Sequence, residues 1–349
     1  MKCRLLALVA ALALLVSGTT ACKKGPQKFS AHSFDYFDTV STVTGYADSQ
    51  ETFDAVSAQV MSLLKEYHQL YNIYLRYEGM HNLCTVNELV LGSHRTVTVD
   101  RRIIDLLLYA REMYNKTGGM VNVAMGSVLK LWHDCRTDGL DNPAAATLPD
   151  AAALAEAAKH TDIQKMVIDE ENNTVTLTDP KMRLDVGAIA KGYAVEQIAR
   201  TLEAQGVTGY VLNVGGNVRT IGTRGDGTPW VVGLEDPADD TAYLAQLQLA
   251  GQALVTSGSY QRYYIVDGKR YHHIIHPDTQ MPAEGWQAVS VVCTDSGMAD
   301  ALSTALFCMD LKQGQALGAS LSDVEVHWVA HDGTRTATDG WQKYVKQGE

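Results

Sequence analysis

The chain has 349 residues, of which 46% are hydrophobic and 20% charged, with 29 Lys and Arg against 40 Asp and Glu. The mean hydropathy of -0.11 is that of an ordinary globular protein and excludes a disordered or a polytopic membrane chain. The net charge of -11 repels nucleic acid, so we expect no nucleic-acid partner. It does not exclude an anionic ligand in a local pocket.

Residues 1–21 have the pattern of a lipoprotein signal peptide. Lys2 and Arg4 precede an apolar run over residues 5–16, which is shorter than the ~20 residues of a membrane span. The run leads to a sequence that resembles a bacterial lipobox ending in Cys22, although Thr19 stands where such boxes carry Leu or Val. We therefore expect export, lipidation of Cys22, palmitate included, and anchoring to the outer face of the bacterial cytoplasmic membrane, which is the periplasmic side where a periplasm exists. The alternative is a plain secretory signal cut near Ala21.

The polar residues 22–32 predict a flexible tether, and residues 33–345 predict one folded domain. Hydrophobic periodicity predicts strands over 34–47, 95–99 and 182–186, helices over 51–71, 100–114 and 193–206, a helix start at 149–150 and a hairpin over 165–178. Strands follow over 209–214, 218–221, 230–234, 244–249, 253–255, 262–266, 271–275 and 287–293, then helices over 298–309 and 313–321 and a strand over 324–330. This order favours an α+β fold with mostly antiparallel sheets.

Four cysteines follow the leader: Cys84, Cys135, Cys293 and Cys308. They form no CxxC motif and no zinc-like spacing. We expect mostly buried free thiols, with one disulfide as the alternative.

The segment LDVGAIAKGYAVE over residues 184–196 predicts a strand, a glycine-containing turn and a helix with Lys191 in its first turns. Such a helix start suits a phosphate group, and Lys191 can act as a point charge on a phosphoryl oxygen. The alternative is a plain connection in which Lys191 is solvated.

A second glycine motif, YVLNVGGNVRTIG, occupies residues 210–222. Paired glycines allow close approach of a ligand to the backbone, but a hairpin turn also explains them. The chain has neither GxGxxG nor a P-loop, so the sequence supports neither a Rossmann cofactor site nor a Walker ATPase.

Three histidines lie in RYHHIIHP, residues 270–277. On a strand, His272 and His276 point to one face and His273 to the other, which disfavours a zinc triad. We expect a single histidine that acts as an acid or base, or contacts a ligand.

The segment DALST, residues 300–304, carries Asp300 and Thr304 four positions apart on a predicted helix. Their oxygens therefore share one face and suit a hard cation such as Mg²⁺ or Ca²⁺. A helix N-terminal acid followed by a buried Thr is the alternative.

Taken together and in this order, these segments resemble the ApbE-like family of FAD:protein FMN transferases. Similar pieces are FDT at 37–39, YEGMHNLCTVN at 77–87, TGGMVNVAMGSVLKLW at 117–132 and TSG at 256–258, while HHIIHP resembles an HxIDP stretch. The resemblance covers about residues 33–345 and implies an α+β, T-fold-like domain with flanking helices. It also implies Mg²⁺-dependent cleavage of FAD, transfer of FMN through a phosphoester to a Thr or Ser of a target protein, and release of AMP.

The resemblance implies a role for each matching position. Mg²⁺ would be held by Asp300, Ser303, Thr304 and the carbonyl of Ala188, while His273 and Asp300 would be the catalytic acid or base. FAD would contact Phe37, Tyr77, Met120, Val121, Asn122, Asp185, Lys191 and Ile274.

Three positions depart from the family pattern. Asn122 stands where Asp is common, His276 replaces the Asp of HxIDP, and Gln280 replaces the Gly of the following turn. The last change removes the residue that adopts a positive φ at no cost, so the geometry of this loop is in question.

The resemblance further implies exported partners, namely flavin-accepting subunits of Rnf- or Nqr-like membrane redox complexes that carry an Asp…Ser/Thr-Gly-Ala motif. Tyr77, at the adenine position, favours transfer over hydrolysis of FAD to FMN and AMP, which is the alternative within the family. A flavin- or solute-binding lipoprotein without turnover is the alternative from another class.

Overall fold

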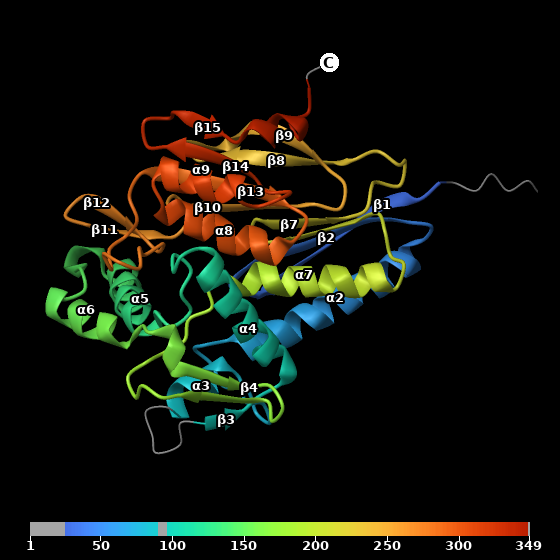
Figure 1. Cartoon of the computed structure of the whole chain (residues 1–349). Helices are drawn as coiled ribbons and strands as arrows, with labels where there is room; N and C mark the ends of the chain where they lie inside the picture. The colour runs from blue at the N-terminus through green and yellow to red at the C-terminus, as the bar shows by residue number, and fades with distance from the viewer. Residues whose placement is uncertain (1–24, 90–95, 348–349) are drawn as a thin grey trace, which may run out of the picture.

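The computed structural model describes residues 25–89 and 96–347 (Figure 1). Its centre is an eight-stranded sheet in the order β1-β2-β6-β7-β10-β13-β14-β15, in which every neighbouring pair is antiparallel. These strands are β1 (Gln27–Tyr36), β2 (Thr39–Ala47), β6 (Tyr210–Val214), β7 (Asn217–Ile221), β10 (Ala253–Gly258), β13 (Trp286–Cys293), β14 (Glu325–Ala330) and β15 (Arg335–Ala337).

Smaller sheets and the helices surround this sheet. The smaller sheets are formed by β3 (Thr96–Thr98), β5 (Thr174–Leu177) and β4 (Met166–Asp169), by β8 (Trp230–Asp236) and β9 (Asp239–Leu249), and by β11 (Tyr263–Val266) and β12 (Lys269–His272). The α-helices are α2 (Gln50–Tyr71), α3 (Leu83–Leu89), α4 (Arg101–Lys116), α5 (Gly126–Asp141), α6 (Ala151–Ala157), α7 (Ala190–Ala204), α8 (Ser296–Cys308) and α9 (Leu311–Ala319).

The two faces of the large sheet are covered differently. Helices α2, α7 and α8 pack on one face, and α7 and α8 lie side by side (Figure 1). The β8–β9 ribbon covers part of the other face through Leu234, Leu247 and Leu249, which pack against Val218 and Leu254 of the sheet. The predicted α+β class with mostly antiparallel strands is confirmed.

Local sequence signals explain where several helices begin. Asp100 caps α4, Asp150 caps α6 and Asp295 caps α8, each by accepting a hydrogen bond from a backbone N–H of the first turn. Asp310 and Gln313 form a reciprocal capping box at the start of α9. These starts agree with the predicted helices at 100–114, 149–150, 298–309 and 313–321.

Helices α7 and α8 approach each other at Gly192. A Cβ atom at this position would overlap the Cβ of Asp300 and the carbonyl oxygen of Ser296. The Gly192 N–H also donates to the Asp300 carboxylate at 2.8 Å. The absence of a side chain at Gly192 therefore permits the contact that joins the two helices.

A buried ion pair supports the same contact. Glu196 on α7 accepts hydrogen bonds from Arg219 Nε of β7 and from the backbone N–H of Ser296 at the start of α8, both at 2.9 Å. Burial opposes ionisation of this carboxyl, but the Arg219 guanidinium lowers the pKa of Glu196 overall. The carboxylate thus ties α7, α8 and the sheet together.

The predicted strand over 34–47 is wrong, because the segment is the hairpin of β1 and β2. Phe37 and Asp38 form its turn, with φ of 55° and 51°. Such positive φ values are most often adopted by Gly, and no Gly marks this turn in the sequence, so the sequence did not indicate a hairpin. The predicted tether is also wrong for residues 27–32, which belong to β1, so the folded domain extends beyond its predicted start at 33. Cys22 and the leader lie outside the described residues.

Other local predictions also fail. Residues 182–186 form only an isolated bridge between Met125 and Arg183, and β12 ends at His272 rather than continuing to 275. Helices α3 and α5 and strand β15 were not predicted from periodicity. Helix α5 buries only Gly126, Val128, Trp132 and Gly139, a pattern too sparse to indicate an amphipathic helix.

The four cysteines of the described chain are free, and Cys84, Cys293 and Cys308 are buried, so the prediction of mostly buried free thiols is confirmed. Among the described residues, no helix combines the length and apolarity that crossing a bilayer requires.

We predict that Gly192→Ala lowers the free energy of unfolding by about 1–3 kcal/mol, because the added methyl group forces α7 and α8 apart. Urea denaturation followed by circular dichroism measures the effect. Gly318→Ala in α9 is the matched control, since its Cβ would meet atoms no closer than 3.7 Å. Equal stabilities for the two variants would contradict the proposed packing role of Gly192.

Candidate active site

A cavity of about 390 Å³ opens where α5, α7, α8, β10 and β12 converge. Most of the residues that sequence reasoning assigned to the site line it. They are Met120, Val121, Asn122, Asp185, Ala188, Lys191, His273, Ile274, Asp300 and Thr304. The GAIAKG bend and the DALST helix therefore meet in one cavity.

Asp300 is the buried carboxylate of this cavity. Burial raises the pKa of Asp300, while the Lys191 charge, the Gly192 N–H and the Asn217 side chain oppose that rise. Asn217 is 2% exposed, and its Oδ1 atom has no hydrogen-bond partner although the residue lines the cavity. An unpartnered buried oxygen beside a carboxylate can coordinate a cation or accept a hydrogen bond from a bound molecule.

The donors near Asp300 fit a hard cation. Thr304 and the Ala188 segment line the same cavity, so carboxylate, hydroxyl, amide and carbonyl oxygens are available together. In the described part of the chain, no three His, Cys, Asp or Glu side chains form a metal-binding group. A cation here would therefore have few charged protein ligands, as is usual for Mg²⁺.

The bend before α7 contributes a second carboxylate. Asp185 accepts a hydrogen bond from the Gly187 N–H at 2.8 Å and lines the cavity. Burial raises the pKa of Asp185, and the Gly187 N–H and the nearby His133 and Arg136 act against it. Lys191 follows in the first turn of α7, so the bend presents charges of both signs.

His272 ends β12 and His273 follows it, and the two histidines differ in what their ring nitrogens bind. His272 Nε2 lies 2.9 Å from the Ala283 carbonyl, and its Nδ1 accepts from the Ile274 N–H. His273 Nδ1 lies 3.2 Å from the Arg262 carbonyl, which can only accept, so Nδ1 carries the proton and Nε2 is unprotonated. His273 is therefore the histidine with a nitrogen available to a ligand.

The protein around His273 disfavours its charged form. The ring is accessible from the cavity, but desolvation by the surrounding protein, together with Arg262, Arg136 and Lys191, lowers the pKa of His273 to about 3. The imidazole is therefore neutral at neutral pH, and its unprotonated Nε2 can accept a hydrogen bond.

Sequence reasoning missed several residues of this cavity. Arg136 of α5 and Arg262 add two cations, and Tyr74 stacks on His133 with ring centroids 4.8 Å apart. No motif marked these residues, because they come from an unpredicted helix and from loops that only the fold brings together.

Three predicted site residues, Phe37, Tyr77 and Ser303, do not line the cavity. The Phe37 N–H donates to His68 Nδ1, and the Tyr77 hydroxyl lies 3.3 Å from His68 Nε2, so both belong to a cluster around that histidine. Their neighbours Asp38, Thr39 and Tyr74 line the cavity instead.

Ser303 is fully buried behind the cavity wall. Its hydroxyl donates to the Asp300 carbonyl at 2.9 Å and lies 2.8 Å from the hydroxyl of Ser257, which does line the cavity. Ser303 therefore positions other groups rather than facing a ligand.

The three departures from the family pattern have local explanations. The Asn122 amide donates to the Thr161 carbonyl and accepts from the Ala124 N–H, so both polar ends bind protein. His276 Nδ1 accepts from the Asp278 N–H as a carboxylate would. Gln280 has φ of 56°, and its side chain donates to the Pro277 and Asp278 carbonyls, which holds the turn.

Comparison with known proteins identifies the family. Residues 37–328 match the model of the ApbE family. The chain is 34% identical to a protein of Klebsiella pneumoniae over 79% of its length and 82% of the relative, and 34% identical to one of Treponema pallidum over 77% and 80%. Both relatives are named FAD:protein FMN transferase. The chain belongs to the ApbE family.

Solved structures agree with this assignment. The ApbE protein of Thermotoga maritima superposes with a TM-score of 0.78 at 26% identity, covering 92% of this chain and 100% of that one. The flavin transferase ApbE of Vibrio cholerae has the same fold, with a TM-score of 0.74 at 22% identity, covering 91% and 99%.

We predict that Arg262→Gln raises the pKa of His273, because the variant removes a positive charge that disfavours the imidazolium. NMR titration of the histidine side chains of the unliganded protein measures this value. Arg335→Gln is the matched control, since burial and Arg335 lower the pKa of His327 to about 4 and the variant should shift only that residue. Titration of His273 near the usual value of about 6.5 in the unaltered protein would contradict the assigned environment.

Proposed function

We propose that the protein is a Mg²⁺-dependent FAD:protein FMN transferase, which cleaves FAD and links FMN by a phosphoester to a Thr or Ser of a target protein. One observation carries the proposal: Asp300 and Lys191, from separate motifs, line one cavity together with the neutral His273. The family and the names of its relatives support the same activity.

The charges of the cavity suit a dinucleotide diphosphate. Lys191, Arg136 and Arg262 supply three cations that can neutralise phosphoryl oxygens. The apolar side chains of Met120, Val121 and Ile274 offer surface to a flavin ring.

The reaction exchanges one phosphorus–oxygen bond for another. The hydroxyl oxygen of the acceptor bonds to the FMN phosphorus, the bond from that phosphorus to the bridging oxygen breaks, and AMP leaves with the electron pair. His273 Nε2 accepts the proton of the incoming hydroxyl. Asp300, Thr304, Asn217 and the Ala188 carbonyl would hold Mg²⁺, which when bound withdraws charge from the phosphoryl oxygens.

Two other functions make different predictions. A family member that hydrolyses FAD would use water in place of the acceptor hydroxyl and would add no mass to a target. A flavin-binding protein without turnover would not need Asp300. Tyr77 lies outside the cavity, so it no longer supports transfer of FMN over hydrolysis of FAD.

The cellular setting extends this proposal. We infer lipidation at Cys22, anchoring to the outer face of the cytoplasmic membrane, and acceptors among flavin-carrying subunits of Rnf- or Nqr-like complexes. The pattern of residues 1–22 supports the anchor, and the similarity to FAD:protein FMN transferases supports a flavin-carrying acceptor. Labelling of the expressed protein with a palmitate analogue, compared with Cys22→Ala, tests the anchor.

We predict that Asp300→Asn lowers FMN transfer by about a hundredfold, since it removes the negative charge from the cation site. Incubation with FAD, Mg²⁺ and a peptide carrying the Asp…Thr-Gly-Ala motif, read by mass spectrometry, measures the added FMN. Asp134→Asn, which changes an exposed carboxylate of α5, is the control. Undiminished transfer by Asp300→Asn, or transfer unaffected by EDTA, would overturn the proposed role of the cation site.

We predict that Lys191→Ala weakens FAD binding about tenfold, because it removes a charged hydrogen-bond donor to phosphate. Quenching of flavin fluorescence on titration measures the affinity. Lys130→Ala, an exposed lysine on α5, is the control and should leave the affinity unchanged. Equal affinities for the two variants would contradict a phosphate contact.

A further inference from the structure

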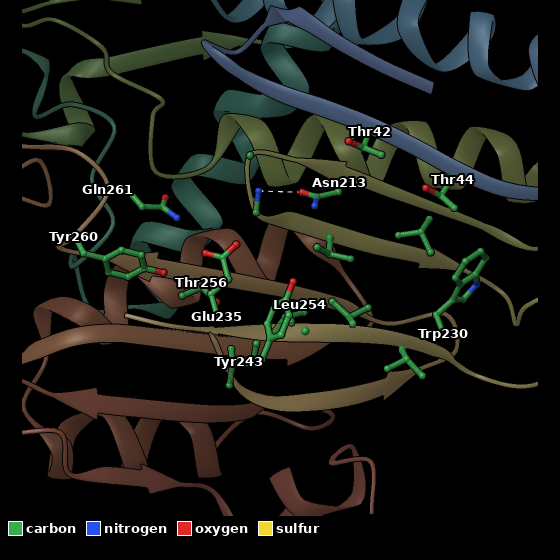
Figure 2. Close-up of a pocket in the computed structure, with 18 of the residues that line it drawn as sticks. Thr42, Thr44, Asn213, Trp230, Glu235, Tyr243, Leu254, Thr256, Tyr260 and Gln261 are labelled. Atoms are coloured by element: carbon green, nitrogen blue, oxygen red, sulfur yellow. Dashed lines mark hydrogen bonds between the residues drawn. The ribbon is translucent and has the colours of Figure 1, made fainter. Parts of the chain in front are cut away.

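A second cavity, of about 340 Å³, lies on the opposite face of the large sheet. Its floor is formed by outward-facing residues of β2, β6 and β10, among them Thr42, Thr44, Asn213 and Leu254, and its wall by β8. Figure 2 shows these side chains between the large sheet and the β8–β9 ribbon, with Trp230 at one end and Tyr260 at the other. The reaction described above does not use this cavity.

The second cavity adjoins the candidate active site. Gly215, Thr256 and Gln261 line both cavities, so one wall of residues separates them. Part of this wall is the β6–β7 turn, in which the Gly216 N–H donates to Asn213 Oδ1 (Figure 2). One end of an extended ligand in the second cavity would therefore lie next to the candidate active site.

The wall formed by β8 is a free strand edge. On its other side β8 pairs with β9, and β9 is in turn bonded by the C-terminal segment through Tyr344 and Lys346. No strand among the described residues pairs with the remaining edge of β8, and residues 230–235 all line the cavity. A free edge of this kind can bind an extended peptide by adding it as another strand.

The charge of the second cavity differs from that of the first. Lys28 and Glu235 are the charged residues of its lining, and the other polar groups are hydroxyls and amides. A diphosphate would find one cation here, against three in the first cavity. Hydroxyls, amides and the aromatic rings of Trp230, Tyr243 and Tyr260 instead suit a peptide with few charged side chains, for which Lys28 is the one cation of the lining.

We propose that the second cavity binds the acceptor segment of the target protein as an extended strand along β8, and directs its hydroxyl past Gly215 and Thr256 into the active site. The proposal rests on the proposed function, because it assigns the protein substrate of that same reaction. The separate cavity lets the acceptor bind whether or not FAD is present.

The test uses Val231→Glu, which places a charge on the edge strand β8, and the matched control Val167→Glu on the edge strand β4. The two valines are 41% and 48% exposed, so neither change buries a charge. We expect Val231→Glu to raise the KM for the Asp…Thr-Gly-Ala peptide about tenfold and to leave FAD affinity unchanged. An unchanged KM for the peptide would overturn the proposal.

Binding measured without turnover separates this inference from the proposed function. The same peptide, with fluorescein and a benzophenone group, is titrated by anisotropy without FAD and then photo-crosslinked for mass mapping. Crosslinks to residues 230–235 or to β2 support the proposal, and crosslinks elsewhere overturn it. Peptide binding at this cavity without FMN transfer would overturn only the proposed function. FMN transfer that Val231→Glu does not affect would overturn only this inference. The absence of both peptide binding and FMN transfer would overturn both.

Discussion

The candidate site depends on the close contact between α7 and α8 at Gly192. Only a glycine lets Asp300 and the Ser296 carbonyl approach this turn of α7, and the Gly192 N–H then holds the Asp300 carboxylate in place. Glu196, one turn later, fixes the start of α8 and binds Arg219 of the sheet. The backbone bend that carries Lys191 and the helix that carries Asp300 are thereby held at one separation, which a site for a cation and a phosphate requires.

The charge of the whole chain gives little information about this site. The net charge is -11, yet three cations gather around one cavity with Asp185 and Asp300 among them. Desolvation disfavours the charged form of His273, and Arg262, Arg136 and Lys191 act in the same direction. Local arrangement therefore outweighs the average charge, because interactions beyond about 10 Å are screened in salt solution.

The part of the site carried by local spacing could be predicted from the sequence. Asp300 and Thr304 share a helix face, and Lys191 follows a glycine turn, so short-range geometry made them candidates. The resemblance of the ordered motifs to the family then selected them over a plain helix cap and a solvated lysine. Arg136 and Arg262 could not be predicted, because nothing in their neighbourhoods indicates that they meet. The hairpin at Phe37 was missed for a different reason: its turn uses positive φ values without glycine, and this turn carries the Phe37 ring to His68 while Asp38 reaches the cavity.

The distance along the chain between Gly192 and Asp300 also bears on how the protein folds. These residues meet across 108 positions, so their contact closes a loop that contains much of the large sheet. Closing so long a loop costs more conformational entropy than a local contact, so the ligand site depends on the rest of the fold. FAD or a cation bound at the finished site would therefore stabilise the whole fold by mass action, because the unfolded chain does not hold the two helices together.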